Sequence, residues 1–403
     1  MGDHVVFLSL HTCPLVQPGR GWAGGMNVYV DELARAMARE GIEVDVFTRR
    51  HDREVPESIT VEPGFSLHHV EAGPPRELDP GRALRYLGVY ADAVIDRLGF
   101  MDDVCVVHSH YWLSGWAGLR IKRHFGLPHI HSSHTLGRVK EASRRGDGNP
   151  ERLMRIAAEQ EVIEESDINV VSGPSEREDL VSRYGADSRR ISIVTPGVDH
   201  DHFVPGVRQS ARIRLGWPEV TTVLYVGRIQ PVKGPDLAIE AFAKIAARVA
   251  DARLVLVGAP AGDDGSREME HLQRMVKTLG LGHLVTFAEP VPHRQLADVY
   301  RAADLVLVPS RSESFGLVAA EAQASGVPVI AASVGGLKTV VGQGSGGILV
   351  DGWDPARWSE KALQVLIDRD LRSQLEADGP LWAERFSWES AVNELGSIYG
   401  TLS

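Results

Sequence analysis

Apolar runs of strand length alternate with amphipathic helical stretches along most of the 403 residues. In the first half, HVVFLSL at residues 4–10 predicts a strand, residues 26–41 a helix that ends at Gly41, and residues 42–49 the next strand. Further strands are expected at VCVVHSH, LPHIHSSH, DINVVSG and RISIVTPG. A parallel sheet with helices on both faces produces this alternation, because its strands are buried on both sides.

The alternation starts again after the proline- and glycine-containing stretch TPGVDHDHFVPG, with strands expected at TTVLYVGR, ARLVLVGAP, LVTFAEP, ADLVLVPS and PVIAAS. The pattern predicts an α/β protein of two Rossmann-like, doubly wound domains, with ligands at the carboxyl ends of the strands and the domains facing each other across a cleft. We expect an N-terminal, acceptor-binding domain over residues 1–205 and a C-terminal, nucleotide-sugar-binding domain over residues 206–385. Residues 386–403 are expected to form a helix that packs back across the domain junction.

Charge and cysteine content limit the classes of partner. The formal net charge of −11 argues against nucleic acid, because a phosphate backbone requires a surplus of Lys and Arg. Cys13 and Cys105 are the only cysteines and show no zinc spacing. A disulfide framework is therefore not expected, and we expect a cytoplasmic location. No run approaches the roughly 20 apolar residues of a membrane span, so a membrane partner is not expected.

Two cations follow the expected strand VLYVG in the second half. Arg228 and Lys233 lie five residues apart, at the end of a strand and beside the N-terminus of a helix. Their charges and the helix dipole would all favour a diphosphate. Gly227 and Gly234 would allow a close approach of the backbone. The alternative is a pair of solvated surface cations.

Two glutamates eight positions apart, Glu313 and Glu321, stand in a small and apolar context. Glu313 is expected in a loop, and Glu321 roughly two turns into a helix that starts near FGLVAAEA. Burying both carboxylates costs roughly several kcal/mol unless hydrogen-bonding or charged partners compensate for the lost hydration. Hydrogen bonds to the hydroxyls of a ribose would do so, and Gly316 would present backbone amides near a phosphate. The alternative is a capping glutamate and a surface glutamate.

The N-terminal half contributes a glycine-rich turn and a group of histidines. The turn PGRGWAGG, which ends at Gly25, leads into a helix and could bind an anion, although a flexible loop would look the same. It lacks the GxGxxG spacing, so no nicotinamide site is expected. No metal site is expected at the histidines, because they have no HExxH or cysteine companion. None is expected at DHDH (residues 199–202) either, because it lies in the linker without a preceding strand. The histidines are His108, His110, His129, His131 and His134.

These motifs resemble the donor site of retaining GT-B glycosyltransferases of family 4: GRIQPVKG with Arg228 and Lys233, and ESFGLVAAEAQASGVPVIAASVGG with Glu313 and Glu321. The resemblance implies that the two cations hold the diphosphate, that Glu313 contacts the donor sugar and that Glu321 contacts the ribose. It places His134 near the reacting carbon and leaves His108 and His110 with structural roles. The implied catalytic residues are His134, Arg228, Lys233 and Glu313, and the implied donor-binding residues add Gly25, Ser314, Phe315, Gly316 and Glu321.

The N-terminal stretches HTCPLVQPGRGWAGGMNVYV, HSHYWLSG and SSHTLGRVK resemble, more narrowly, the D-inositol 3-phosphate glycosyltransferase family. That resemblance implies transfer of N-acetylglucosamine from UDP-GlcNAc to 1D-myo-inositol 3-phosphate, in mycothiol biosynthesis. The implied acceptor-binding residues are Asn27, Tyr111, Thr135 and Arg155. The lysine with which the family binds phosphate falls on Pro80, a loss of about ten- to a hundred-fold in affinity that Arg76 or Arg82 could offset.

The resemblance implies a front-face reaction in which the leaving diphosphate accepts the proton of the acceptor. Glu313 is the only candidate for a covalent nucleophile, and the family gives it a sugar-binding role instead. No cofactor is required, and any magnesium would accompany the diphosphate; a homodimer is compatible with these expectations. Other acceptors stay open, namely a polyol, an aminocyclitol of an antibiotic pathway or a sugar phosphate, since GGMNVY is also similar to sucrose-phosphate synthase. A UDP-sugar epimerase and an inactive nucleotide-sugar sensor are further alternatives.

Overall fold

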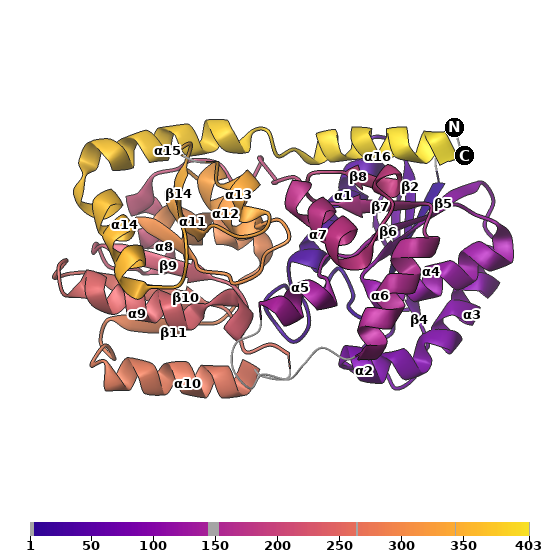
Figure 1. Cartoon of the computed structure of the whole chain (residues 1–403), viewed down its shortest axis with the longest axis horizontal. Helices are drawn as coiled ribbons and strands as arrows, with labels where there is room; N and C mark the ends of the chain where they lie inside the picture. Colours follow the sequence, from indigo (N-terminus) through magenta and orange to yellow (C-terminus); the bar gives the residue numbers. More distant parts are fainter. Residues whose placement is uncertain (1–3, 144–152, 263–264, 343, 403) are drawn as a thin grey trace. The chain divides into compact units, whose positions relative to one another are not determined.

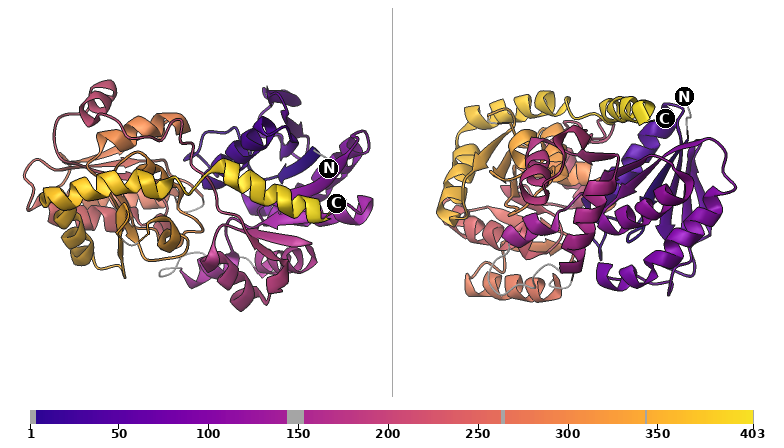
Figure 2. Two further views of the ribbon diagram at one scale, coloured as in Figure 1. Left: turned by 90° about the horizontal axis from the view of Figure 1, so that it is seen from above. Right: turned by 45° about the vertical axis from the view of Figure 1, so that its right-hand side comes forward.

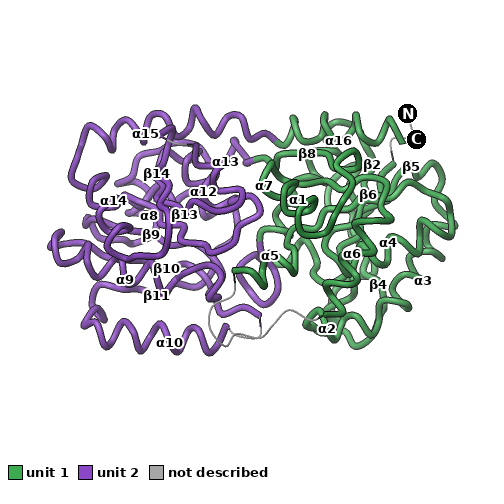
Figure 3. The backbone as a smooth tube through the Cα atoms, viewed as in Figure 1, with its two compact units in different colours: residues 1–16, 25–197, 388–403 green, residues 17–24, 198–387 purple. Residues whose placement is uncertain are grey.

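The computed structural model describes residues 4–143, 153–262, 265–342 and 344–402. The chain forms two compact units (Figure 3), of which unit 1 comprises Met1–Val16, Gly25–Gly197 and Trp388–Ser403. Unit 2 comprises Gln17–Gly24 and Val198–Ser387. Both are α/β units built on a largely parallel sheet, so the predicted fold class is confirmed. Within the described ranges, no helix is both long and apolar enough to cross a membrane.

Unit 1 is built on an eight-stranded sheet with the spatial order β3-β4-β2-β1-β5-β6-β7-β8. Neighbouring strands are parallel except at the edge, where β3 and β4 form an antiparallel hairpin. The strands are β1 (His4–Ser9), β2 (Glu43–Arg49), β3 (Ser58–Glu62), β4 (Phe65–Val70), β5 (Val104–His110), β6 (His129–Ser132), β7 (Ile168–Val171) and β8 (Ile191–Ile193).

Helices cover both faces of this sheet (Figures 1 and 2). They are α1 (Gly25–Arg39), α2 (Pro80–Ala83), α3 (Leu87–Leu98), α4 (Trp112–Phe125), α5 (Gly137–Ala142), α6 (Leu153–Glu165), α7 (Pro174–Tyr184) and α16 (Trp388–Leu402). Alternate residues of β1 separate two cores, because successive side chains of a strand point to opposite faces. Val5 and Phe7 pack with α1 and α16, whereas Val6 and Leu8 pack with α3 and α4.

Unit 2 is built on a six-stranded parallel sheet with the order β11-β10-β9-β12-β13-β14. The strands are β9 (Thr222–Val226), β10 (Arg253–Val257), β11 (Val285–Ala288), β12 (Leu305–Val308), β13 (Val329–Ala332) and β14 (Gly347–Val350). The helices are α8 (Arg208–Leu215), α9 (Pro235–Ala246), α10 (Gly265–Thr278), α11 (Leu296–Ala302), α12 (Leu317–Ala324), α13 (Leu337–Val340), α14 (Pro355–Ile367) and α15 (Arg369–Ala383).

Each sheet has a point at which the strand order reverses. In unit 1 the chain runs from β1 outward through β2 on one side and through β5 on the other. In unit 2 it runs outward from β9 through β10 on one side and through β12 on the other. Ligands of doubly wound sheets bind at the carboxyl ends of the strands that flank such a reversal. The loops after β1 and β5, and those after β9 and β12, are therefore the places to look for a site.

The units divide between Gly197 and Val198, eight residues before the boundary expected after position 205. Val198 pairs with Ser387 in a β-bridge, and His200 bonds through Nε2 to the carbonyl of Phe386 at 2.9 Å, so this stretch is held by unit 2. The glycine-rich segment Gln17–Gly24 also belongs to unit 2, with Gly21 bridged to Ala261. Such backbone pairing to distant residues leaves no apolar pattern, and therefore the sequence did not reveal it.

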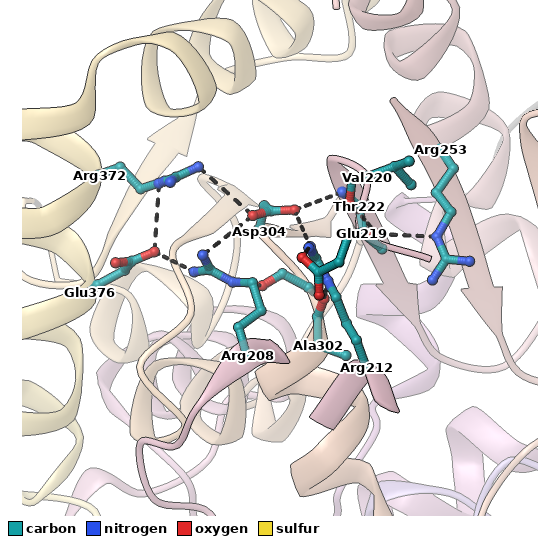
Figure 4. A network of polar contacts seen from close by, with 11 residues as sticks. Arg208, Arg212, Glu219, Val220, Thr222, Arg253, Ala302, Asp304, Arg372 and Glu376 are labelled. Atoms are coloured by element: carbon teal, nitrogen blue, oxygen red, sulfur yellow. Dashed lines mark hydrogen bonds and ion pairs between the residues drawn. The ribbon is translucent and has the colours of Figure 1, made fainter. Parts of the chain in front are cut away.

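A buried ion-pair network in unit 2 centres on Asp304, which immediately precedes β12 (Figure 4). Its Oδ2 accepts from Arg212 and from the backbone N–H of Thr222, both at 2.7 Å. Its Oδ1 lies 3.4 Å from Arg208 and 3.8 Å from Arg372, and both arginines also pair with Glu376. The network thus ties α8 and α15 to the first residues of β9 and β12.

Candidate active site

The predicted donor residues of unit 2 follow the two strands that flank the strand-order reversal. Arg228 and Lys233 lie in the loop after β9, and Glu313 lies in the loop after β12. Because β9 and β12 are parallel neighbours, both loops leave the same edge of the sheet. The topology therefore brings the predicted donor residues Arg228, Lys233 and Glu313 to one edge of the sheet.

An ion pair joins the two loops directly. Lys233 Nζ donates to Glu313 Oε2 at 2.7 Å, and the hydroxyl of Ser310 donates to the same oxygen at 3.2 Å. About a fifth of each charged side chain, 23% for Lys233 and 19% for Glu313, is exposed. The ammonium therefore has room for a second anionic partner while Glu313 holds it in place.

A second ion pair, between Arg311 and Asp236, is more buried and fixes the backbone of both loops. Arg311 donates to Asp236 at 2.6 Å, and its backbone N–H donates to the carbonyl of Val232 at 2.7 Å. Gly234 has φ +70°, and a Cβ there would stand 2.2 Å from the carbonyl oxygen of Pro309. Only glycine fits this close crossing of the two loops.

The loop after β12 leads through Ser314 and Phe315 into α12, which begins after Gly316. Gly316 caps the helix with φ +112°, and a Cβ there would stand 2.6 Å from Leu337. The ring of Phe315 is buried in the core, 5.5 Å from the ring of Phe386. A donor molecule could meet Phe315 only through its backbone, whereas Ser314 is half-buried.

Arg228 packs against the glycine-rich segment. The side chain is half-buried, and a Cβ on Gly24 would come within 3.2 Å of its Nε. The segment is fastened to unit 2 by Gln17, whose Nε2 donates to the carbonyl of Pro290 at 2.7 Å. A larger residue at Gly24 would press on the guanidinium and require it to shift by a few tenths of an ångström. Gly25, the predicted donor residue, is the first residue of α1 in unit 1.

Glu321 lies four residues into α12, just over one turn rather than the roughly two turns expected, because the helix begins only at Leu317. The carboxylate is buried, with 4% of the side chain exposed. Its Oε1 is 2.6 Å from Nε2 of His293, and its Oε2 accepts from the hydroxyl of Tyr300 at 2.8 Å. Protein groups therefore compensate its burial, although a carboxylate can accept about four hydrogen bonds and has capacity left.

Replacing Tyr300 with phenylalanine is expected to lower the free energy of unfolding by about 1.5–3 kcal/mol, since it removes a hydrogen bond to a buried carboxylate. Tyr90 is the matched control, because it is equally buried and donates to a neutral carbonyl, that of Phe47, at 2.8 Å. Tyr90→Phe should cost only about 0.5–1.5 kcal/mol. Urea unfolding of both variants measures the difference, and equal losses would show that Glu321 draws no special support from Tyr300.

In unit 1 the predicted catalytic residue His134 follows β6, and Tyr111 follows β5. Both have positive φ, +57° and +75°, which costs non-glycine residues of order 1–3 kcal/mol and is typical of functional sites. His134 Nε2 is 3.0 Å from Nδ1 of His110, so His110, expected to be structural, supports the predicted catalytic ring. Burial lowers the pKa of His134 to about 3, and the ring is therefore neutral at neutral pH.

The other histidines hold the sheet together. His108 bonds to the hydroxyls of Tyr399 at 2.8 Å and Ser132 at 2.9 Å, which ties β5 to α16 and β6. Ser109 Oγ lies 2.8 Å from His129 and 2.9 Å from His131. Burial lowers the pKa of all three rings, so they are neutral hydrogen-bonding groups within a core.

Three of the four predicted acceptor residues lie together. Arg155 donates to the hydroxyl of Thr135 at 3.1 Å, and its guanidinium carbon stands 5.3 Å from the centre of the Tyr111 ring. Glu159 accepts from Nε of Arg155 at 2.7 Å and so orients the guanidinium. A cation on α6, with a hydroxyl and a phenol from the loops after β6 and β5, suits a phosphate. The fourth residue, Asn27, instead donates to Oγ1 of Thr12 and to the carbonyl of Cys13, both at 2.7 Å.

Pro80, at the position of the family's phosphate-binding lysine, is the first residue of α2. Asp79 caps that helix and pairs with Arg82 at 3.1 Å. Arg76 and Arg82 are both exposed, and neither is fixed in the core as Arg155 is. The proline suits its place in the fold, because the first helical position needs no backbone N–H.

Sequence reasoning did not identify His293, Tyr300 or Arg311, and it took His110 for a structural residue. The first two come from the segment that leads into α11 and from α11 itself, outside any recognised motif. Arg311 lies two residues before the motif that begins at Glu313, and Asp236 lies two residues after the motif that ends at Gly234. These two opposite charges beside the motifs were a signal for the pair. His110 had one too, since it ends its strand two residues after His108.

Comparisons with known proteins show which family the chain belongs to. The chain matches the family models Glycosyltransferase Family 4 over residues 23–202 and Glycosyl transferases group 1 over residues 208–382. A D-inositol 3-phosphate glycosyltransferase from Thermobispora bispora is 42% identical, with 98% of this chain and 94% of that protein covered. One from Geodermatophilus obscurus is 45% identical, with 98% and 88% covered.

Solved structures extend the likeness to the fold. Sucrose-phosphate synthase from Thermosynechococcus elongatus superposes with a TM-score of 0.91 at 31% identity, covering 99% of this chain and 98% of that chain. Anabaena Alr3699/HepE superposes with a TM-score of 0.78 at 16% identity, covering 99% of both chains. This chain is a glycosyltransferase enzyme that belongs to family 4 and has the GT-B fold.

Proposed function

We propose that this enzyme transfers N-acetylglucosamine from UDP-N-acetylglucosamine to 1D-myo-inositol 3-phosphate, with retention of configuration at the anomeric carbon. The grouping of Arg155, Thr135 and Tyr111 carries the proposal, because a buried cation beside two hydroxyl groups suits an acceptor phosphate. Relatives that share 41–45% of the sequence bear the name D-inositol 3-phosphate glycosyltransferase, which supports this acceptor. The Anabaena protein of the same fold was solved with UDP and glucose, which supports a nucleotide-sugar donor.

In the proposed step, an acceptor hydroxyl oxygen bonds to the anomeric carbon as the bond from that carbon to the diphosphate breaks. The proton of the hydroxyl passes to the leaving phosphate oxygen. Arg228 and Lys233 stabilise the negative charge that develops on the diphosphate, and they are in place before the reaction. Glu313 is a poor covalent nucleophile, because its Oε2 already accepts from Lys233 and Ser310.

His134 is proposed to hydrogen-bond a hydroxyl of the donor sugar as a neutral ring, held by His110. Glu321 is proposed to receive the ribose hydroxyls with the capacity that His293 and Tyr300 leave. The transfer needs no cofactor in this scheme, and a magnesium ion would enter with the diphosphate. The cytoplasm stays the proposed compartment on cysteine usage alone, and a homodimer stays a prediction.

A second candidate is transfer to another phosphorylated acceptor, such as a sugar phosphate. Pro80 in place of the family's lysine favours it, as does the 31% identity to sucrose-phosphate synthase over 99% of the chain. The donor side of the proposal is the same in both cases. The two candidates differ only in the molecule that meets Arg155 and Thr135.

Incubation of the enzyme with UDP-N-acetylglucosamine and 1D-myo-inositol 3-phosphate is expected to yield UDP and the glycosylated inositol phosphate by mass spectrometry. myo-Inositol without phosphate is the matched control and should react at least about ten-fold less well, since a charge-assisted contact contributes about 1.5–3 kcal/mol. NMR of the product reports the anomeric configuration. UDP release with fructose 6-phosphate but not with the inositol phosphate would favour the second candidate, and an unconsumed donor would contradict the choice of donor.

A further inference from the structure

Three residues of metal-binding types, none of them assigned to transfer, lie together in unit 1. Cys13 follows β1, His51 follows β2, and His69 is the penultimate residue of β4. The order β4-β2-β1 makes these strands neighbours, and all three residues lie at or beyond their carboxyl ends. The three residues are 38 and 18 positions apart in the sequence, so they form no short motif that could be recognised there.

The ligand atoms are close enough to share one ion. One such atom from each residue lies within 4.8 Å of those of the other two. Cys13 Sγ and His69 Nε2 are 3.7 Å apart. A tetrahedral zinc ion with ordinary bond lengths separates a sulfur and a nitrogen ligand by about 3.6 Å. Two of the three ligands thus already stand at the separation that zinc requires, and the ligand atom of His51 lies within 4.8 Å of both.

The orientation of His69 is that of a metal ligand. Its Nδ1 donates to the carbonyl of Pro56 at 2.7 Å, which leaves the lone pair on Nε2 facing the sulfur. A backbone carbonyl that holds the far nitrogen is the usual outer partner of a zinc-bound histidine. Cys13 and His69 are buried, and His51 is half-buried.

Two polar atoms at this place lack partners among the described residues. Nδ1 of His51 is buried without a hydrogen bond, and so is Oγ1 of Thr48. Thr48 is the register partner of His69 in the parallel pair β2–β4, so both side chains lie on the same face of the sheet. Buried polar groups are rarely left unpaired, and a bound ion with its water would satisfy both.

We propose that Cys13, His51 and His69 bind one zinc ion. The ion would tie the loop after β1 to the loop after β2 and to β4, and its fourth position would take a water or an anionic oxygen. One thiolate and two imidazoles are a donor set that zinc accepts readily, whereas magnesium and calcium require oxygen ligands. The proposal does not depend on the proposed transfer chemistry, although the carbonyl of Cys13 accepts from Asn27, an implied acceptor-binding residue.

The test uses the full-length chain without a polyhistidine tag, first stripped with a chelator and then titrated with Co²⁺ as a spectroscopic probe. One equivalent should give a thiolate-to-cobalt charge-transfer band, which one equivalent of Zn²⁺ abolishes. Cys13→Ser should remove the band, and Cys105→Ser, the only other cysteine, should keep it. At free zinc 100 times the dissociation constant, the ratio of folded to unfolded protein should rise about 100-fold, measured by urea unfolding.

A histidine variant keeps the proposal testable if Cys13→Ser does not fold. His51→Ala, on a half-buried loop residue, should raise the zinc dissociation constant at least about 100-fold, whereas His283→Ala, on an exposed histidine of unit 2, should not change it. If the charge-transfer band survives in Cys13→Ser or zinc affinity survives in His51→Ala, the ion sits elsewhere and the proposal is wrong. If no stoichiometric metal binding is found, the group is only a buried contact between a sulfur and an imidazole, and the proposal is equally wrong.

Discussion

Arg228→Ala is expected to lower kcat by about 100- to 1,000-fold, the usual cost of removing one preorganised group that stabilises developing charge. The guanidinium follows β9 at the strand-order reversal and is fitted against Gly24. Its proposed partner is the diphosphate, whose charge grows as the bond to the sugar breaks. The loss should therefore appear mainly in kcat, with a smaller change in KM for the donor. Coupled detection of UDP release measures both constants.

Two further variants separate this role from general effects of charge and folding. Arg228→Lys keeps the positive charge but loses the planar pair of donors, so its activity should fall between wild type and Arg228→Ala. Arg248→Ala removes an exposed arginine of the same unit and should leave the rate unchanged. Near-normal turnover in Arg228→Ala, with the melting temperature preserved, would sink the assignment of Arg228.

The parallel strands were the most predictable part of the fold. VCVVHSH, for example, is β5 from Val104 to His110, as expected. A strand buried on both faces must be apolar almost throughout, and this leaves a plain signal. The edge hairpin β3–β4 was missed because its strands are partly exposed and mix polar with apolar residues. Pro63 and Gly64 between them were a turn signal that could have revealed it.

The sequence named candidate site residues but not the contacts between them. Lys233 and Glu313 are 80 positions apart, and their ion pair follows from the adjacency of β9 and β12, which the sequence does not state. The partners of Glu321 also come from outside its motif, which is why its burial was explained by a ligand alone. The group Cys13, His51 and His69 depends on the order of three strands in the same way.

Asp304→Ala is expected to lower the free energy of unfolding by about 3–5 kcal/mol, because it leaves a buried cation without its counter-charge. Only 6% of the Arg212 side chain is exposed, and its other carboxylate partner, Glu219, is 58% exposed. The change also removes the acceptor for the backbone N–H of Thr222, at the first residue of β9 (Figure 4). Urea unfolding gives the loss directly. Asp251→Ala, at an exposed aspartate of the same unit, should change stability by no more than about 0.5 kcal/mol.

Asp304→Asn separates charge from hydrogen bonding at the same position. The amide oxygen can still accept from Thr222, so the backbone contact at the start of β9 survives while the attraction to Arg212 is lost. The free energy of unfolding of Asp304→Asn should therefore lie between that of the wild type and that of Asp304→Ala. If alanine and asparagine cost the same, the buried charge determines the stability of this network. If Asp304→Asn leaves the free energy of unfolding almost unchanged, Asp304 acts chiefly as the acceptor for the first backbone N–H of β9. The arginines are then solvated without its charge.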